Sequence, residues 1–109
     1  MSIKYIYHHT GIPTQQIVPG MCHVRHLGIY CTDHESNPFR IQWMKYEVNC
    51  GLPELVRTVA HVAFVVDNLE EALQGKHVIV KPNSPSPGVM VAMIEEAGAP
   101  VELMYYDKP

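Results

Sequence analysis

The chain has 109 residues, 47% of them hydrophobic, and its formal net charge is −3. This length predicts a single domain over residues 1–109, and this apolar fraction argues against a disordered chain. Because the sequence has no basic face and no aromatic residues interleaved with basic ones, nucleic acid is not an expected partner.

The first half of the chain predicts strands joined by irregular segments. An apolar, β-branched stretch over about residues 4–12 is typical of a strand, and further strands are expected near 22–32 and 39–48. The intervening TQQIVPG contains Pro19 and Gly20, which would end any helix almost at once. Residues 49–59 are expected to form a linker.

The second half predicts the order strand, helix, strand, strand, strand. AHVAFVV at 60–66 begins it. DNLEEALQG then predicts a helix of about two turns, with Asp67 as N-cap, Glu70 three residues later and Gly75 as the stop. The turns NSPSPG and AGAP separate the remaining strands, which are expected at 76–82, 89–96 and 101–107.

The two halves repeat one another. RIQWMKYE in the first half aligns with PVELMYYD in the second, so that Gln42 corresponds to Glu102. Upstream, HHTGIPT aligns with AHVAFVV, so that His9 corresponds to His61. The second half is longer, and its additional residues fall in the predicted helix. The sequence therefore predicts module one over about 3–48 and module two over about 60–107.

The repeated strands suggest a shared site. Because side chains on a strand alternate between faces, Gln42 shares one face with Met44 and Tyr46, and Glu102 shares the equivalent face with Met104 and Tyr106. If the units pair about an approximate two-fold axis, two imidazoles, an amide oxygen and a carboxylate can converge. These are plausible ligands for a divalent metal ion. The candidate ligands are His9, Gln42, His61 and Glu102.

Structural interpretations compete with this one. A lone His at a strand start is more often structural than a ligand, and a Glu on a terminal strand is usually solvated. His34 and His77 lie near predicted turns and are expected to be exposed. The candidate substrate-binding residues could equally be core packing; they are Met44, Tyr46, Met104 and Tyr106.

No feature indicates export or a membrane. The start, MSIKYIYHHT, has no apolar core and no small-residue cleavage site, and no apolar run approaches the ~20 residues that span a bilayer. Cys22, Cys31 and Cys50 lack CxxC spacing. That pattern favours reduced thiols in the cytoplasm over disulfides or a zinc knuckle.

The motifs YHHTGIPT, VAHVAFVVDNLEEAL and GAPVELMYYD resemble the vicinal oxygen chelate superfamily of glyoxalases, bleomycin-resistance proteins and dioxygenases, over nearly the whole chain. The resemblance implies an α+β fold, in which two paired βαβββ modules form a cupped, barrel-like mixed sheet around a metal ion. The helix of the first module is truncated here. Carried over one by one, the ligands of that superfamily fall on the four candidates, and the set is similar to that of methylmalonyl-CoA epimerase.

The resemblance also implies an activity: a metal-dependent isomerase, epimerase or lyase that binds a small-molecule substrate and stabilises an enediolate-type oxyanion. The ion would be Zn, Co, Ni, Fe or Mn. Glu102 is the expected catalytic base, because a carboxylate can accept a proton whereas the amide of Gln42 does not titrate. No further base aligns; the nearest acids are Asp33 and Glu35. The alternatives are a metal-free small-molecule or drug-binding protein, and a dioxygenase.

A homodimer is the expected assembly. Short units with one truncated helix leave sheet edge or apolar surface uncovered. Whether the modules pair within one chain or between two chains stays open at this point.

Overall fold

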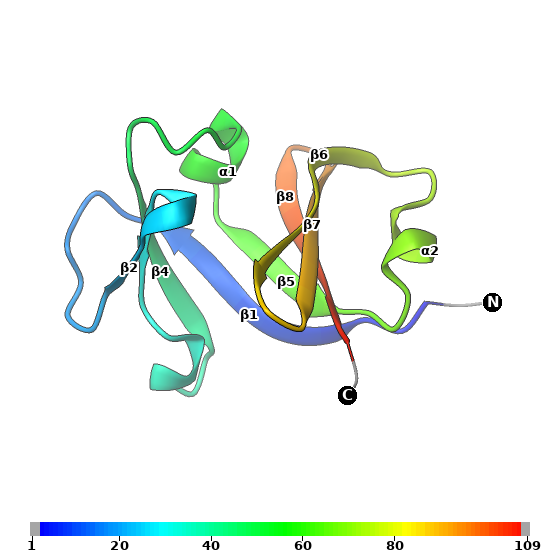
Figure 1. The fold of residues 1–109 in the computed structure, drawn as a ribbon, viewed down its shortest axis with the longest axis horizontal. Helices are drawn as coiled ribbons and strands as arrows, with labels where there is room; N and C mark the ends of the chain where they lie inside the picture. Colours follow the sequence, from blue (N-terminus) through cyan, green and yellow to red (C-terminus); the bar gives the residue numbers. More distant parts are fainter. Residues whose placement is uncertain (1–2, 108–109) are drawn as a thin grey trace.

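The structure, a computed structural model, describes residues 3–107 as one mixed sheet of eight strands that curls into a half-barrel with few helices (Figure 1). The order across the sheet is β2-β3-β4-β1-β5-β8-β7-β6. The strands are β1 (Ile6–Pro13), β2 (Cys22–Val24), β3 (Ile29–Cys31), β4 (Ile41–Tyr46), β5 (His61–Val65), β6 (His77–Ser86), β7 (Val89–Glu96) and β8 (Ala99–Tyr106). The helices are α1 (Glu54–Thr58) and α2 (Leu69–Leu73), with 3-10 turns η1 (Arg25–Leu27) and η2 (His34–Ser36).

The N-terminal half-sheet (β2-β3-β4-β1) and the C-terminal half-sheet (β5-β8-β7-β6) have the same arrangement. The first strand of each pairs in parallel with the last, β1 with β4 and β5 with β8, and the other pairs are antiparallel. An antiparallel pair of β1 and β5 joins the halves. Gly11 lies opposite Gln42, and Ala63 lies opposite Glu102. The two parallel pairs therefore have equivalent registers, in agreement with the sequence alignment of the two halves.

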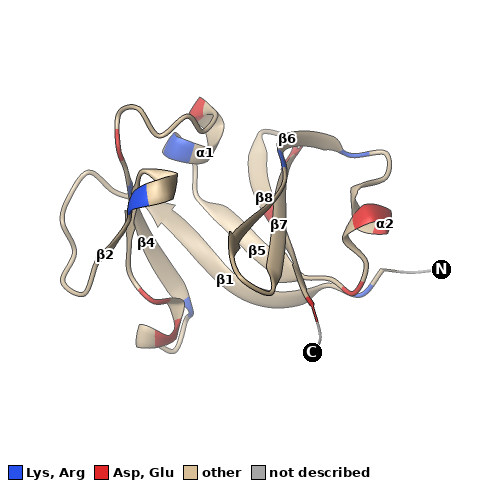
Figure 2. Ribbon diagram, in the orientation of Figure 1, with Lys and Arg blue, Asp and Glu red and all other residues tan. Residues whose placement is uncertain are grey.

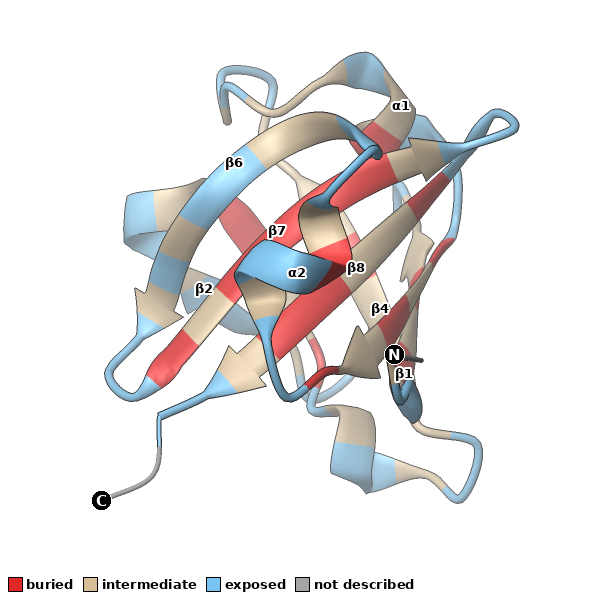
Figure 3. Ribbon diagram, turned by 90° about the vertical axis from the view of Figure 1, so that its right-hand side faces the viewer, coloured by how far each residue is buried: buried red, intermediate tan, exposed pale blue. Residues whose placement is uncertain are grey.

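Successive side chains of β8 point to opposite faces of the sheet and pack in two separate hydrophobic clusters. Met104 packs with Ala63, Val89 and Val91 on the concave side, whereas Leu103 packs on the other side. Figure 3 shows buried positions running along β7 and β8 beneath α2. The residues around Leu103 are Val66, Ala72 and Ile94. Glu102, on the same face as Met104, is thereby directed into the concave side.

The helix of the second half is present, but its cap differs from the prediction. Asn68 rather than Asp67 caps α2, and its Oδ1 accepts a hydrogen bond of 2.9 Å from the Glu71 amide. Gly75 follows with φ of 72°, a left-handed conformation that suits glycine and ends the helix. Residues 14–21, which all lie within the described chain, form no helix, as Pro19 and Gly20 predict.

Three other segments depart from the expectation. The strand expected over 22–32 is split into β2 and β3 by η1, and Gly28 provides the left-handed residue that turns the chain back. The expected linker 49–59 contains α1, which the sequence analysis missed. β6 continues to Ser86 instead of ending at residue 82, with irregular register against β7. Helix α1 places Val56 against the sheet, only 2% exposed.

The turn between β7 and β8 sets the position of the last strand. Ala97 and Gly98 form a two-residue loop with φ of 51° and 87°, the geometry of a tight hairpin turn with two left-handed residues. This confirms the turn expected in AGAP. The hairpin fixes the register in which Met93 lies opposite Glu102.

Charged residues are dispersed over the fold. In Figure 2 the acidic and basic positions lie scattered among helices, loops and strand ends, without a face of a single sign in that view.

No helix within residues 3–107 combines the length and the apolar character required to cross a membrane.

Candidate metal centre

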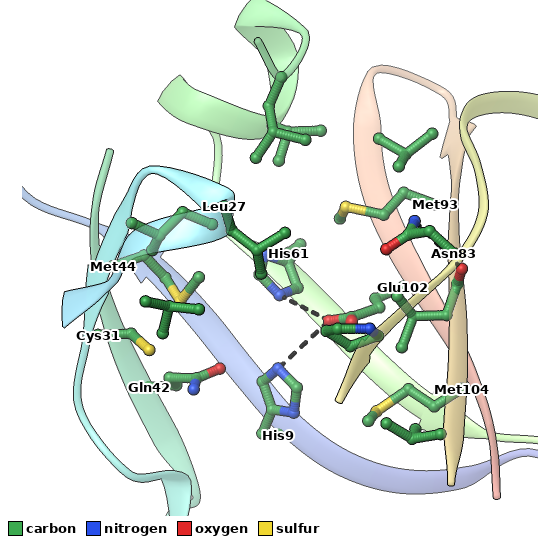
Figure 4. A pocket seen from close by; sticks show the side chains of 18 of the residues that line it. His9, Leu27, Cys31, Gln42, Met44, His61, Asn83, Met93, Glu102 and Met104 are labelled. Carbon is green, nitrogen blue, oxygen red and sulfur yellow. Dashed lines mark hydrogen bonds and ion pairs between the residues drawn. The ribbon is translucent and has the colours of Figure 1, made fainter. Parts of the chain in front are cut away.

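Three of the four predicted ligands meet where β1, β5 and β8 lie side by side (Figure 4). Glu102 Oε1 lies 3.4 Å from His9 Nε2 and 3.2 Å from His61 Nε2. One ligand atom from each residue lies within 4.8 Å of the others. The two histidines are almost fully buried, at 4% and 3% exposure. The structure therefore holds a compact, buried group that could bind a metal ion.

Small residues on the central strands make room for the imidazoles. His9 lies opposite Ala63 across the β1–β5 pair, and His61 lies opposite Gly11. A Cβ atom at residue 11 would overlap the His61 ring. Gly11 is thus required by the close approach of a side chain, a role that the sequence repeat did not reveal.

The nitrogen atoms of this group have few partners in the protein. His9 Nε2 and both ring nitrogens of His61 are buried without a hydrogen-bond partner among the described residues. The contacts with Glu102 are at ion-pair distance but lack hydrogen-bond geometry. Each unpaired buried polar atom costs about 1–3 kcal/mol, and a cation at the centre would give the two Nε2 atoms a partner. Two imidazoles and a carboxylate therefore fit a divalent ion of the zinc, cobalt, nickel, iron or manganese type.

Glu102 carries its charge in this environment. Burial by itself raises the pKa of the carboxyl, but the interactions of the carboxylate with the side chains of His61 and His9 outweigh burial and lower the pKa from 4.5 to about 2. An ionised carboxylate is the form that binds a cation.

This lowered pKa predicts an acid-dependent stability. Because the folded-state pKa lies below the ordinary value, ionised Glu102 stabilises the fold above pH 4.5, and this contribution is lost as the pH falls toward 2. Urea unfolding of the metal-free protein over this range should show a steeper loss of unfolding free energy in wild type than in Glu102→Gln. Equal slopes would contradict the assignment of the shift to this carboxyl.

Gln42, the fourth predicted ligand, lines the same cavity from β4. Figure 4 shows its amide between Cys31 and His9, on the N-terminal side of the centre. It lies on the wall next to the group that Glu102 forms with the two histidines.

The cavity has a volume of about 380 Å³ and lies between the two half-sheets. All four predicted substrate-binding residues line it: Met44, Tyr46, Met104 and Tyr106. Helix α1 and the segment before it close one side with apolar side chains, Leu52 and Val56. Within residues 3–107, Glu102 is the one carboxylate in the lining, and no Lys or Arg lines it.

The hydroxyl of Tyr46 is available to a ligand. It is buried and has no hydrogen-bond partner among the described residues. Burial, and to a smaller degree the charge of Glu102, raises the pKa of this phenol, so that it stays a neutral hydrogen-bond donor. A substrate oxygen in the cavity would give it a partner.

Two histidines of the cavity were missed by the sequence analysis. His34, expected to be exposed, lines the cavity with a side-chain exposure of 22%, and its ring centroid lies 4.4 Å from that of His8. His8 should face away from His9 by strand alternation. A shift of register between Tyr7 and His9 breaks the alternation, so both imidazoles reach the cavity. His77 is 70% exposed, as expected.

The comparisons with known proteins show the fold and leave the activity open. No protein-family model matches the chain, and no curated protein matches it. The fold is similar to the crystal structure of hypothetical protein BH1468 from Bacillus halodurans C-125, with a TM-score of 0.65 and 17% sequence identity. The similarity covers 100% of this chain and 98% of that one.

Proposed function

We propose that the protein is a metal-dependent small-molecule enzyme of the vicinal oxygen chelate superfamily, acting as an isomerase, epimerase or lyase. The observation that carries the proposal is the buried group of His9, His61 and Glu102, whose ligand atoms lie within 4.8 Å of one another. The shared register of the two half-sheets supports the finer description of the fold as two paired βαβββ modules.

The residues have separate tasks in this proposal. His9, His61 and Glu102 would hold a divalent ion, with Gln42 as a fourth ligand, and the ion would supply Lewis-acid stabilisation of negative charge on a substrate oxygen. Tyr46 donates a hydrogen bond to a substrate oxygen from its unpartnered hydroxyl. The methionines, together with Leu52 and Val56 from the segment of α1, give the cavity an apolar wall.

Glu102 is the candidate for proton transfer, because it is the carboxylate of the cavity lining within residues 3–107. Its pKa of about 2 makes it a weak base. Proton abstraction therefore requires a substrate whose carbon–hydrogen bond is strongly acidified, such as one next to a carbonyl group.

The cavity favours an apolar substrate body. Its walls carry valine, leucine and methionine side chains from both half-sheets and from the segment of α1, without a lysine or arginine among the described lining. A volume of about 380 Å³ is at the small end of ligand pockets. We expect a small, mostly uncharged molecule with oxygens at one end.

Metal titration tests the proposal directly. Calorimetric titration of metal-free protein with Zn²⁺, Co²⁺, Ni²⁺, Mn²⁺ and, under nitrogen, Fe²⁺ should reveal one site per chain. If no ion binds, the proposed enzyme function is wrong, and the apolar walls favour the alternative of a metal-free small-molecule or drug-binding cup.

The second alternative, a dioxygenase, would use the same three ligands, because two histidines and one carboxylate are the ligand set of non-haem iron oxygenases. Selective iron binding with oxygen consumption would favour it.

We also propose a homodimer. The two outer strands of the described sheet, β2 and β6, leave its edges open, and large apolar side chains are exposed at Ile17, Phe39 and Val48. Light scattering during gel filtration should give twice the chain mass of 12.3 kDa. A mass equal to that of one chain at micromolar concentration would count against the dimer.

A further inference from the structure

A chain of polar contacts leads from His9 to the edge of the cavity. His8 Nδ1 lies 2.7 Å from His9 Nδ1, and His8 Nε2 lies 3.0 Å from the hydroxyl of Tyr106. The main chain at His8 is also held, because its carbonyl oxygen accepts a hydrogen bond of 2.5 Å from Arg40 Nε. The His8 ring stacks at a tilt against His34. His8 is therefore fixed from several sides.

The positions of the protons follow from this geometry. Two ring nitrogens 2.7 Å apart share one proton, so one of them donates and the other accepts. A metal ion on His9 Nε2 leaves the proton of that ring on Nδ1, which then donates to His8 Nδ1. His8 consequently carries its own proton on Nε2, which donates to the oxygen of Tyr106.

We propose that His8, supported by Tyr106, is a positioning residue of the metal centre that fixes the tautomer and ring orientation of His9. This role rests on the proposed metal binding. The contact makes His9 a better ligand, because an outer hydrogen-bond acceptor orients the ring and raises its basicity. The family resemblance assigned no role to His8.

The two halves of the chain differ at this point. The residue that precedes His61 is Ala60, which has no side chain able to accept a hydrogen bond, and His61 Nδ1 has no partner among the described residues. The centre therefore has one histidine with an outer hydrogen-bond partner, His9, and one without such a partner, His61. His9 is the ligand for which an outer partner can be removed.

Two substitutions of similar size separate this role from simple packing. His8→Asn can keep an acceptor oxygen near the place of Nδ1, whereas His8→Leu has none. Zinc titration should show affinity that is about 10–100-fold weaker in His8→Leu, and His8→Asn should recover most of the loss. Tyr106→Phe should weaken binding in the same direction by less. His77→Leu, the same change at an exposed histidine of β6, is the matched control and should leave affinity unchanged.

Spectroscopy supplies a second readout. In zinc-loaded protein labelled with nitrogen-15, the proton on His9 Nδ1 should exchange slowly and show a scalar coupling across the hydrogen bond to His8 Nδ1. His8→Leu should lose both signatures while circular dichroism reports an unchanged fold. Equal zinc affinity in His8→Leu and wild type, or a zinc-loaded wild type without the coupling, would overturn the role of His8 alone. Failure of wild type to bind any ion would instead overturn the proposed function and, with it, this role.

Discussion

Glu102→Gln should weaken zinc binding by far more than the 10–100-fold typical when a residue that only hydrogen-bonds a metal ligand is replaced. The substitution keeps the shape of the side chain but removes the anion of the buried group, whose Oε1 lies 3.2–3.4 Å from both histidine Nε2 atoms. Competition titration with a chromophoric chelator measures the change. The fold should persist, because an amide of the same size replaces the carboxylate.

Gln42→Glu provides the reciprocal control for that experiment. It adds a negative charge to the wall of the same cavity, and it should tighten binding of a divalent cation. Opposite changes at Gln42 and Glu102 are expected from a shared metal site, and a purely structural role for these residues would not produce them. Unchanged affinity in both variants would leave the metal-free cup as the better interpretation.

Gly11→Ala should abolish metal binding without touching any ligand. The added Cβ atom would occupy the place of the His61 ring, which must then leave the centre or push β1 and β5 apart. Zinc affinity measured by calorimetry, together with thermal unfolding, reports both effects. We expect loss of the site in a chain that still folds, since the three atoms nearest to the added Cβ all belong to the His61 ring, a side chain that can move.

Ala63→Gly is the matched control, because Ala63 lies opposite His9 as Gly11 lies opposite His61. It removes a methyl group instead of adding one. It should cost about 0.5–1 kcal/mol of stability, as glycine in a strand does, and it should leave zinc binding largely intact. If Gly11→Ala bound zinc like wild type, the His61 ring would not lie over residue 11 as the structure places it.

The repeat made much of the fold predictable. Aligning His9 with His61 and Gln42 with Glu102 predicted that the two halves are arranged alike, and the parallel pairs β1–β4 and β5–β8 have equivalent registers. The strand expected over 89–96 has these bounds in the structure. Alternation also placed Met104 in the cavity and Leu103 away from it. Wherever a strand is regular, the alternation of its residues predicted which side chains face the cavity.

The remainder depended on tertiary geometry. His8 enters the cavity because the β1–β5 register shifts beside it, and such an irregularity belongs to the pair of strands and not to either sequence alone. The same holds for Gly11, whose role depends on a ring from another strand. Helix α1 was within reach of sequence analysis, because Leu52, Leu55, Val56 and Val59 have helical spacing and Pro53 suits a helix start, in a segment expected to be only a linker.

The start of β1 and the end of β8 lie at the same end of the central sheet. Ile6 is opposite Val65 across the antiparallel pair, and Val65 is opposite Met104 in the parallel one. None of the three clustered ligands comes from the segment between β4 and β5. A circular permutation that closes the chain near β1 and β8 and opens it just after β4 would keep every strand pairing of the centre. The site therefore does not depend on which half comes first in the chain. It depends on the pairing of β1 with β5, which joins the two halves.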